Sequence, residues 1–471
     1  MDGTGPLPDK LIADLGKAAD VIKSAKNVLV ITHIDADGIS AGAVAVSTLK
    51  RLGKDHDIIF EKKITEDTIS MVNASTVDVV WICDLGSAYL SGFKRSGIVV
   101  TDHHVPDPKW RKKQTFLDDF CDIHHLNPHI YGASGSYEVC GAGMTYLLSK
   151  TIDPKNIDLA YLAVVGAVGD FQDSRESKLV SYNRIILGDA ETVGDVEVCQ
   201  DIRFYGRDSR PLTQFLQFCS DPSIPGITDN AAGAQIFFST LKIPLKNGSS
   251  WRTWNNLDPD EKSKAVGALR RLLNDPSSDG HLCGEVYNLP KFNPKTGLRD
   301  AKEYATVLNA CGRYDDAETG LRICLGDQEA IKDADRNRTD HRRNISVALT
   351  YIKENRLLRE RRFIQYFDAG SEIRETVVGI VAGMLLNSGD AKKNLPIFAF
   401  ADADDGVKVS ARASRTLTDR GLDLSFVMKT ASEVVGGFGG GHSVAAGATI
   451  PRGKEEAFLD AVEDIVSSQV I

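Results

Sequence analysis

The sequence predicts an α/β protein with a parallel sheet in its first part, a helical insert and connector in the middle, and a smaller mixed α/β domain at the end. Strand and helix patterns alternate through the first 190 residues, strand signals fade between 191 and 362, and strand patterns return beyond Phe363. Such alternation is typical of a parallel sheet covered by helices on both faces. A chain of 471 residues is long enough for roughly two to three domains. We place the boundaries at 1–190, 191–362 and 363–471.

The elements of the first region follow one another as strand and helix. Short apolar segments rich in β-branched residues predict strands at 26–34, 57–60, 77–84 and 97–101. Helices are predicted at 39–52, which is rich in alanine, and at 141–150, with a short polar helix after Phe60. Turn-forming residues between 106 and 135 predict a long loop.

The later regions are predicted from the positions of Pro and Gly residues and from the composition. Pro and Gly residues between 211 and 226 separate helical segments and predict a helical insert. Residues 341–362 are a strongly basic helix candidate, which is either a solvated connector or a surface that follows phosphates. Beyond it we expect a helix at 375–386, paired strands at 395–400 and 406–411, and a glycine-dense stretch at 434–442.

Polar residues lie at the ends of four apolar runs, which we take to be strands. Because ligands bind at the carboxyl ends of the strands in an open parallel sheet, we expect these polar side chains to gather in one crevice. They are His33, Asp35 and Asp37 after the first run, Asp84 after the second, Asp102, His103 and His104 after the third, and Asp170 after the fourth, which covers 159–169.

Several carboxylates in one crevice need compensating charge. Two of them about 4 Å apart repel by about 4 kcal/mol at an effective dielectric constant of about 20, so cations or protons must be present. Oxygen ligands with one or two imidazoles and no thiolate suit Mn²⁺ or Mg²⁺. Two such ions, about 3.5–4 Å apart, would activate a water and hold a phosphoryl oxygen for in-line attack.

Each of these elements also has a plain structural interpretation. Asp37 could be the N-cap of the following helix, and Asp84 and Asp170 could end a segment and cap a turn. Asp102-His103-His104 directly after a buried strand has no packing reason, so we favour a functional interpretation of the set as a whole.

The combined pattern resembles the DHH family of phosphoesterases. An Asn/Arg segment at 308–313 is similar to one in RecJ-type exonucleases, and the closest likeness is to the archaeal RecJ-like single-strand exonucleases of the GINS-associated nuclease group. By this resemblance 1–190 would be a DHH domain and 363–471 a DHHA1-type domain that binds nucleic acid. The segments that carry it are THIDADG at 32–38, DLG at 84–86, TDHH at 101–104, GAVGD at 166–170 and GGGHSVAAG at 439–447.

The resemblance implies a role for each residue of the set, with two Mn²⁺ or Mg²⁺ ions as the cofactor. Asp37, Asp84, His103 and Asp170 would be metal ligands, with His33 and Asp35 in or beside the same coordination shell. His104 would contact the scissile phosphate or stabilise its developing charge. Asp102 would ligate a metal or orient the imidazoles.

Further segments are candidates for contacts with nucleic acid. Residues 436–442 could form an anion nest or a strained turn, and the resemblance favours nucleotide binding by Gly439, Gly440, Gly441 and His442. Ser410 and Arg412 follow a strand and could point the same way, with Arg412 binding a phosphate or forming a surface ion pair. The resemblance makes Asn309 and Arg313 phosphate contacts. We assign His124, His125 and His129 to a loop at the rim of the site rather than to a second metal site.

Bulk properties exclude some classes of protein. No apolar stretch of about 18 residues and no signal-peptide pattern is present, so we expect a cytoplasmic protein without a membrane span. The sequence contains no C-x-x-C pair, so we do not expect a structural zinc site. A net charge of −9 argues weakly against a nucleic-acid partner, but local basic surfaces decide because charges are screened over about 8 Å.

Three functions remain open. The leading one is a metal-dependent exonuclease in replication or repair, which would thread single-stranded DNA or RNA between the two α/β domains. The second is a phosphoesterase of the same family acting on short oligonucleotides, nucleotide phosphates or cyclic dinucleotides. The third is a replisome scaffold that binds the GINS complex, since a eukaryotic helicase cofactor related to the family keeps the fold without the metal ligands. The intact set here favours catalysis.

Overall fold

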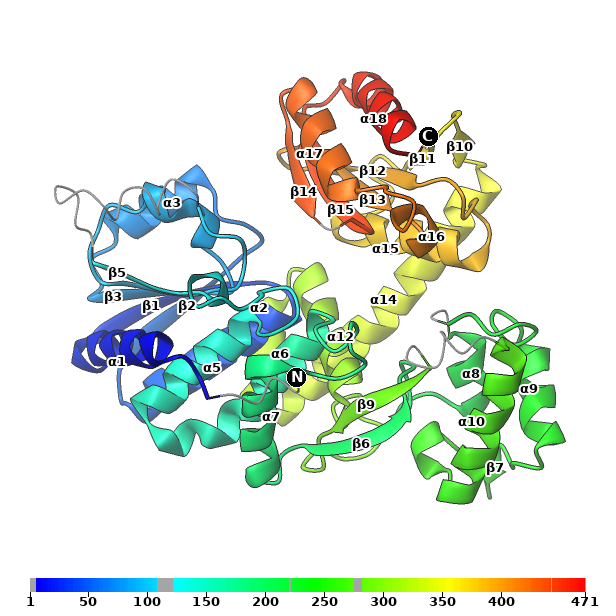
Figure 1. Ribbon diagram of the computed structural model, residues 1–471, viewed down its shortest axis with the longest axis horizontal. Coiled ribbons are helices and arrows are strands. Elements are labelled where there is room, and N and C mark those ends of the chain that lie inside the picture. The colour runs from blue at the N-terminus through cyan, green and yellow to red at the C-terminus, as the bar shows by residue number, and fades with distance from the viewer. Residues whose placement is uncertain (1–5, 108–121, 220–221, 275–281, 442, 471) are drawn as a thin grey trace. The chain divides into compact units, whose positions relative to one another are not determined.

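The computed structural model describes residues 6–107, 122–219, 222–274, 282–441 and 443–470. The chain divides into two compact units, Met1–Asn337 and Arg338–Ile471 (Figure 1). The first unit holds a parallel sheet followed by a mostly helical part, and the second holds a mixed sheet. The predicted fold class is therefore confirmed.

The sheet of the first unit has five parallel strands in the order β2-β1-β3-β4-β5. The central strand β3 is buried along its whole length, as expected where helices cover both faces. Helices α2 and α5 contact one face, while side chains of α3 and of the short helix η1 (Ser87–Gly92) pack on the other. The strands are β1 (Asn27–His33), β2 (Asp55–Glu61), β3 (Val79–Cys83), β4 (Ile98–Thr101) and β5 (Ile123–Leu126).

The prediction of a continuous loop between 106 and 135 is wrong in its second half. Residues 123–126 form β5, which pairs with β4, and the short helix η2 (Pro128–Ile130) follows. The sequence Ile-His-His-Leu has too few apolar residues to signal a strand. Pairing with β4 stabilises the extended conformation there, although the local β propensity is weak. His124 and His125 therefore lie on a strand.

The helices of the first region pack closely around α2, in which 13 of 16 residues are buried. Its many Ala and Gly residues allow α5 and α6 to approach it. The helices are α1 (Asp9–Ser24), α2 (Ala36–Arg51), α3 (Glu66–Ala74), α5 (Gly141–Ile152), α6 (Ala160–Gly169) and α7 (Ser181–Thr192).

The fourth apolar run is a helix, α6, and not a strand as predicted. Protein surrounds it, because α2, α5, α7 and α12 all contact it, and nine of its ten residues are buried. A helix buried on all sides is apolar all round and has no amphipathic period, so periodicity could not distinguish it from a buried strand. Its length of ten residues was the available signal.

The middle part has a small core of its own around Phe215, Phe238 and Trp254. It also contains an antiparallel strand pair, β6–β9, which the predicted helical insert lacked. Its elements are β6 (Glu197–Ile202), α8 (Leu212–Gln217), α9 (Ala231–Thr240), β7 (Lys246–Asn247), β8 (Ser250–Trp251), α10 (Pro259–Leu273), β9 (Cys283–Asn288), α12 (Ala301–Arg313), α13 (Ala317–Cys324) and α14 (Gln328–Glu354).

The predicted basic helix at 341–362 is shorter than expected at its C-terminal end. Helix α14 ends at Glu354, and Arg356 has a left-handed backbone (φ 49°), which is a common way for a helix to stop. Residues 359–360 instead form the edge strand β10.

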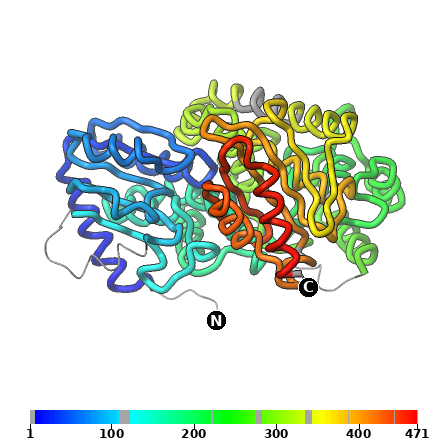
Figure 2. The backbone as a smooth tube through the Cα atoms, turned by 90° about the horizontal axis from the view of Figure 1, so that it is seen from above, coloured from blue at the N-terminus to red at the C-terminus, as the bar shows by residue number. Residues whose placement is uncertain are grey.

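The second unit is a six-stranded mixed sheet in the order β10-β11-β12-β13-β15-β14. Helix α15 packs on one face and α17 on the other; Figure 2 shows α18 (red) beside α17 (orange). The predicted strand pair and the helix at 375–386 are confirmed. The elements are β10 (Arg359–Glu360), β11 (Gln365–Asp368), α15 (Glu375–Ser388), β12 (Ile397–Ala403), β13 (Gly406–Arg412), α16 (Arg415–Thr418), α17 (Leu424–Val434), β14 (Phe438–Gly441), β15 (Ala445–Ile450) and α18 (Glu455–Val470). Among the described residues, no helix combines the length and apolar character needed to cross a membrane.

Candidate metal centre

The turn between β1 and α2 brings three polar residues of the set together. His33 is the last residue of β1, and Asp35 is the N-cap of α2, where its Oδ1 accepts a hydrogen bond from the Gly38 N–H at 2.9 Å. The suggestion that Asp37 is the cap is therefore wrong. A Cβ at Gly38 would collide with the backbone carbonyl of His33, so the tight turn requires glycine.

Asp37 is buried and held by the N-terminus of a second helix. The N–H of Gly141 donates to its Oδ2 at 2.7 Å, and the N–H of Ala142 donates to its Oδ1 at 2.9 Å. These are the first two residues of α5, whose N-terminal dipole favours a carboxylate. Asp37 therefore has a fixed orientation.

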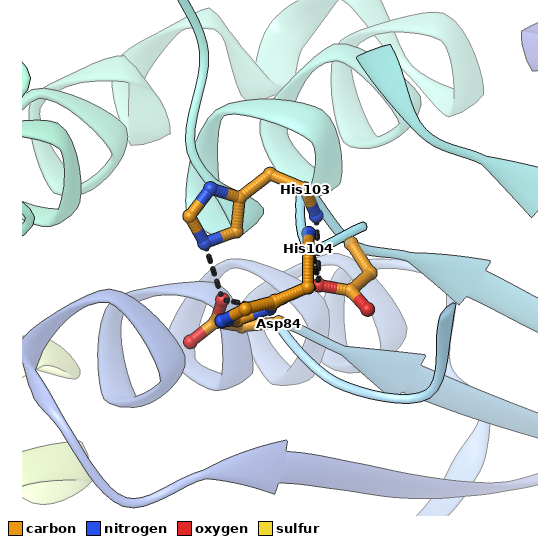
Figure 3. Close-up of side chains that lie close together, drawn as sticks. Asp84, His103 and His104 are labelled. Carbon is orange, nitrogen blue, oxygen red and sulfur yellow. Dashed lines mark hydrogen bonds and ion pairs between the residues drawn. The ribbon is translucent and has the colours of Figure 1, made fainter. Parts of the chain in front are cut away.

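Asp84 lies at the middle of the cluster, directly after β3. Its Oδ1 is 3.2 Å from His103 Nε2 (Figure 3). Its Oδ2 is 3.4 Å from His33 Nδ1. Its backbone is left-handed (φ 56°), a conformation that Asp tolerates better than most residues. Asp84 Oδ1 and His33 Nδ1 are buried and make ion-pair contacts, with His103 and with Asp35 Oδ2 at 3.0 Å, but no aligned hydrogen bond. A bound cation would satisfy such atoms better than these contacts do.

The ring of His103 is oriented through its other nitrogen. Its Nδ1–H donates to the carbonyl of Gly135 at 2.6 Å, which leaves Nε2 facing Asp84 and, at 3.3 Å, Asp170 Oδ2. The same carbonyl accepts a hydrogen bond from Gln172 Nε2 at 2.8 Å, and Asn183 Nδ2 donates to Gln172 Oε1 at 2.6 Å. A carbonyl that fixes the tautomer in this way is typical of metal-binding histidines.

Asp102 has both oxygens committed to hydrogen bonds. Its Oδ1 accepts from the backbone N–H of His103 at 2.7 Å and lies 2.8 Å from His104 Nδ1, while its Oδ2 accepts from the Ser87 N–H at 2.8 Å. Of the two roles left open for it, this geometry favours orienting the imidazoles. His104 is the most open of these residues, with 53% of its side chain exposed.

Asp170 reaches the cluster from the C-cap of α6 and not from the end of a strand. The polar set falls into three overlapping groups, within each of which the possible ligand atoms lie within 4.8 Å of one another. The groups are Asp37, His103 and Asp170; His33, Asp35 and Asp84; and Asp84, Asp102, His103 and His104. The structure therefore brings together every residue that the sequence placed in this crevice.

The charges of the cluster do not balance. Burial, and then the neighbouring Asp84 and Asp170 carboxylates, raise the pKa of Asp37 well above its usual range. Burial also raises the pKa of Asp170 to about 7. Burial lowers the pKa of His103, but Asp84 and Asp170 outweigh it and raise that pKa well above the usual value. The cluster thus needs positive charge, and oxygen donors with imidazoles fit Mn²⁺ or Mg²⁺.

Asn309 and Arg313 lie on α12, beside the loop that carries the carboxylates. Asn309 Oδ1 accepts a hydrogen bond from the Ala36 N–H at 3.0 Å, between Asp35 and Asp37. Arg313 is largely buried; burial lowers its pKa, and Asp35 partly counteracts that shift. Asn309 therefore holds the loop, a function that the sequence did not reveal.

The other candidates for nucleic-acid contacts belong to the second unit. Ser410 and Arg412 are within β13 rather than after it, and they share the face that packs on α15 at Gly379. Gly439, Gly440 and Gly441 form the edge strand β14, paired with β15, so the expected turn or nest is not seen there. His442 lies outside the described residues.

The rim histidines and several supporting residues complete the surroundings. His125 Nε2 is 2.8 Å from Ser87 Oγ, so it supports the residue that holds Asp102. Gly135, Gln172 and Asn183 were missed by sequence reasoning, because they lie in separate segments and no motif or spacing links them to His103.

Three family models match the chain. The DHH family N-terminal domain matches residues 27–166, the DHH-CID domain matches 204–277, and the DHHA1 domain matches 360–468. An uncharacterized protein of Methanocaldococcus jannaschii is 28% identical over 448 residues, which are 94% of this chain and 94% of that protein.

Solved structures share the fold along nearly the whole chain. RecJ from Thermus thermophilus with Mn²⁺ has a TM-score of 0.58 at 17% identity over 99% of this chain, which spans 56% of that RecJ chain. The Mg²⁺ complex of the same RecJ, at 17% identity over 99% of this chain and 54% of that chain, has a TM-score of 0.51. CDC45 from Entamoeba histolytica has a TM-score of 0.62 at 12% identity, with 98% of each chain covered.

The structural likenesses show a fold in common, and they include proteins solved with the two ions that suit this cluster. The three family models follow one another in the order of the observed architecture, from the parallel sheet through the middle part to the mixed sheet. Residues 27–166, 204–277 and 360–468 therefore carry a DHH, a DHH-CID and a DHHA1 domain, respectively.

Proposed function

We propose that this protein, whose family assignment supports a hydrolase of phosphate esters, is a metal-dependent exonuclease that acts on single-stranded DNA or RNA in replication or repair. The convergence of Asp37, Asp84, His103 and Asp170 on one buried, negatively charged centre carries the proposal. The fold shared with RecJ supports the choice of a nuclease over other phosphoesterases.

The positions of the residues in the cluster suggest different roles in catalysis. Asp37, Asp84, His103 and Asp170 would hold the cations, with His33 and Asp35 beside Asp84. Bound divalent cations supply Lewis-acid stabilisation of phosphoryl oxygens and make water acidic enough to attack near neutral pH. Asp102 fixes Nδ1 of His104, so the half-exposed ring of His104 presents Nε2 to the scissile phosphate.

Digestion of single strands labelled at either end, with Mn²⁺ present, tests the proposal. We expect Asp37→Ala and His103→Ala to lose about 10³-fold or more of kcat/KM, because several kcal/mol of charge stabilisation are removed. Asp57→Ala, an exposed carboxylate on β2, is the matched control and should keep full activity. Full metal-dependent activity in the first two variants would contradict the site assignment.

The substrate length distinguishes the exonuclease from the second candidate of the same family. A long labelled strand should be degraded with a kcat/KM at least equal to that of a dinucleotide. Strong preference for the dinucleotide would favour a phosphoesterase of short oligonucleotides or cyclic dinucleotides.

A scaffold function is the remaining candidate, and the fold shared with CDC45 is the reason to test it. Catalysis and scaffolding are compatible, so we propose the GINS complex as a partner. Pull-down of the full chain with purified GINS should recover a complex at micromolar concentrations, and no recovery would contradict this partner.

A further inference from the structure

Two exposed apolar residues directly follow residues of the metal centre in the sequence. Among the exposed large apolar residues that the structure describes, Val105 at 72% and Phe171 at 70% are the most exposed. Val105 directly follows His104, and Phe171 directly follows Asp170. Single exposed apolar residues are common on protein surfaces. Their position beside two different residues of the cluster is what calls for an explanation.

The backbone of Phe171 is held in an unfavourable conformation. Its φ is 56°, in the left-handed region that costs a bulky residue energy. Its N–H donates to the Val168 carbonyl at 3.1 Å, and its own carbonyl accepts from the N–H of Ser174 at 3.0 Å and from Ser174 Oγ at 2.6 Å. Strain that the surroundings fix in this way is often found at functional sites.

Phe171 contributes little to the hydrophobic core, so packing does not offset the energy of its left-handed backbone. With 70% of its surface exposed it buries little apolar area, and it belongs to none of the hydrophobic clusters of the described residues. A polar residue, or a glycine, would fit the left-handed position better. Folding alone therefore does not account for a phenylalanine here.

A nucleobase is the ligand that fits an aromatic ring beside a phosphate-cleaving centre. Bases stack on aromatic side chains in single-strand binding proteins, and each such contact is sequence-tolerant because every base has a π-face. The same loop also carries Arg175, an exposed cation held 4.2 Å above the ring of Tyr137, which suits the charged backbone of a strand.

We propose that Phe171 is the stacking platform for the base next to the scissile phosphate, with Val105 as a second apolar contact. The inference rests on the proposed function and adds to it a substrate requirement, namely an unpaired base beside the bond that is cut. It makes Phe171 a substrate-binding residue and not a metal ligand.

Strands with and without the base test the proposal in the full-length protein. One strand is intact, and matched strands carry abasic residues at the last two positions of either end. Phe171→Ala should lower kcat/KM on the intact strand by about tenfold, equivalent to about 1.4 kcal/mol, and leave it unchanged on the abasic strand that lacks bases at the cleaved end. Phe171→Trp should retain activity on the intact strand, while Phe171→Leu should resemble Phe171→Ala.

A binding measurement separates this proposal from the proposed function. A strand with 2-aminopurine at its end should lose fluorescence on binding to the wild type, and less on binding to Phe171→Ala. Phe218→Ala, which removes an exposed phenylalanine directly after α8, is the control and should behave as the wild type in both assays.

The outcomes are distinct. Equal losses on intact and abasic strands, or no loss on either, would overturn the stacking platform while leaving the exonuclease in place. A wild-type protein that binds and quenches the strand without cutting it would refute the exonuclease and support the platform. A wild-type protein that neither cuts nor binds would overturn both.

Discussion

Two buried clusters of charged residues lie in the first unit, and they differ in whether their charges are balanced within the protein. Around Arg207 the charges are paired: its guanidinium donates to Asp300 Oδ2 through Nε at 3.0 Å, and to Asn288 Oδ1 at 2.7 Å. Nearby, Arg203 pairs with Asp173 at 2.6 Å. At the metal centre, carboxylates outnumber imidazoles, and the buried Asp84 Oδ1 and His33 Nδ1 have ion-pair contacts but no aligned hydrogen bond.

The difference shows how a structural cluster is told from a functional one. Buried charges are stable when opposite charges and hydrogen bonds satisfy them. The cluster around Arg207 meets that condition largely within the protein, whereas the metal centre meets it only with added cations or protons. Charge imbalance, more than burial, therefore marks the functional site.

The largest effect is expected when the cluster around Arg207, called the balanced cluster below, loses its central cation. Arg207→Ala should lower the free energy of unfolding by about 3–5 kcal/mol, because Asp300 would remain buried without its ion-pair partner, while Asp201 would keep Lys262. Urea denaturation followed by circular dichroism measures it. Arg271→Ala on the exposed side of α10 should change stability by less than about 0.5 kcal/mol. A similar small change in Arg207→Ala would show that the pairing is dispensable.

The cluster around Arg207 is incomplete at Glu303 and at Arg203 Nε, which is buried without a hydrogen-bond partner. Glu303 Oε2 is also buried without a partner, and burial raises the pKa of Glu303 to about 7. The folded protein therefore keeps a proton that the unfolded chain releases near its ordinary pKa of about 4.3. The contribution of Glu303 to the free energy of unfolding should therefore fall as the pH rises from there to 7, by on the order of 3 kcal/mol.

Glu303→Gln should remove the part of the fall in stability that Glu303 contributes and leave the part due to Asp170, whose pKa is also about 7, as measured by urea denaturation at a series of pH values. Glu318→Gln, an exposed carboxylate on α13, should leave the pH dependence unchanged. An identical pH profile in the wild type and Glu303→Gln would contradict the raised pKa.

The next effect concerns the support of the metal centre. Gln172→Met cannot donate to the Gly135 carbonyl, which orients His103, so we expect the Kd for Mn²⁺ to rise by about 10- to 100-fold. Electron paramagnetic resonance of free Mn²⁺ measures the affinity. Gln214→Met, at an exposed position on α8, is the control. Unchanged affinity would mean that Gly135 needs no support.

The smallest effect contrasts two aspartates three residues apart. In chelator, Asp170→Asn removes one of several repelling carboxylates and should raise the free energy of unfolding by on the order of 1 kcal/mol. Asp173→Asn removes the partner of Arg203 and should lower it. Thermal unfolding of the metal-free variants tests the pair. Destabilisation by both substitutions would contradict the distinction between the two clusters.

The sequence predicted that these polar residues converge in one place, because they lie next to recognisable apolar runs. Asp37, Asp84 and His103 follow strands that stand out locally, and the topology of a parallel sheet then places them together. Asp170 was placed correctly for a wrong reason, since α6 is a helix whose uniformly apolar composition hides its period.

The balanced cluster and the supporting residues could not be predicted in this way. Arg207 and Asp300 are 93 positions apart, and no local pattern connects them. Gln172 acts through a backbone carbonyl, which carries no side-chain signature. Interactions of this kind become visible only when the packing of the chain is known.

The hydrogen bond from Ala36 to Asn309 joins positions 273 residues apart. Next to it, Gly312 packs so closely on the Ile34 carbonyl that no larger residue would fit. A truncated fragment ending at residue 190 would contain every proposed ligand. It would lack Asn309, however, so the turn between Asp35 and Asp37 would lose the hydrogen bond that holds it. During synthesis, too, the ion-binding geometry can be completed only after α12 has left the ribosome.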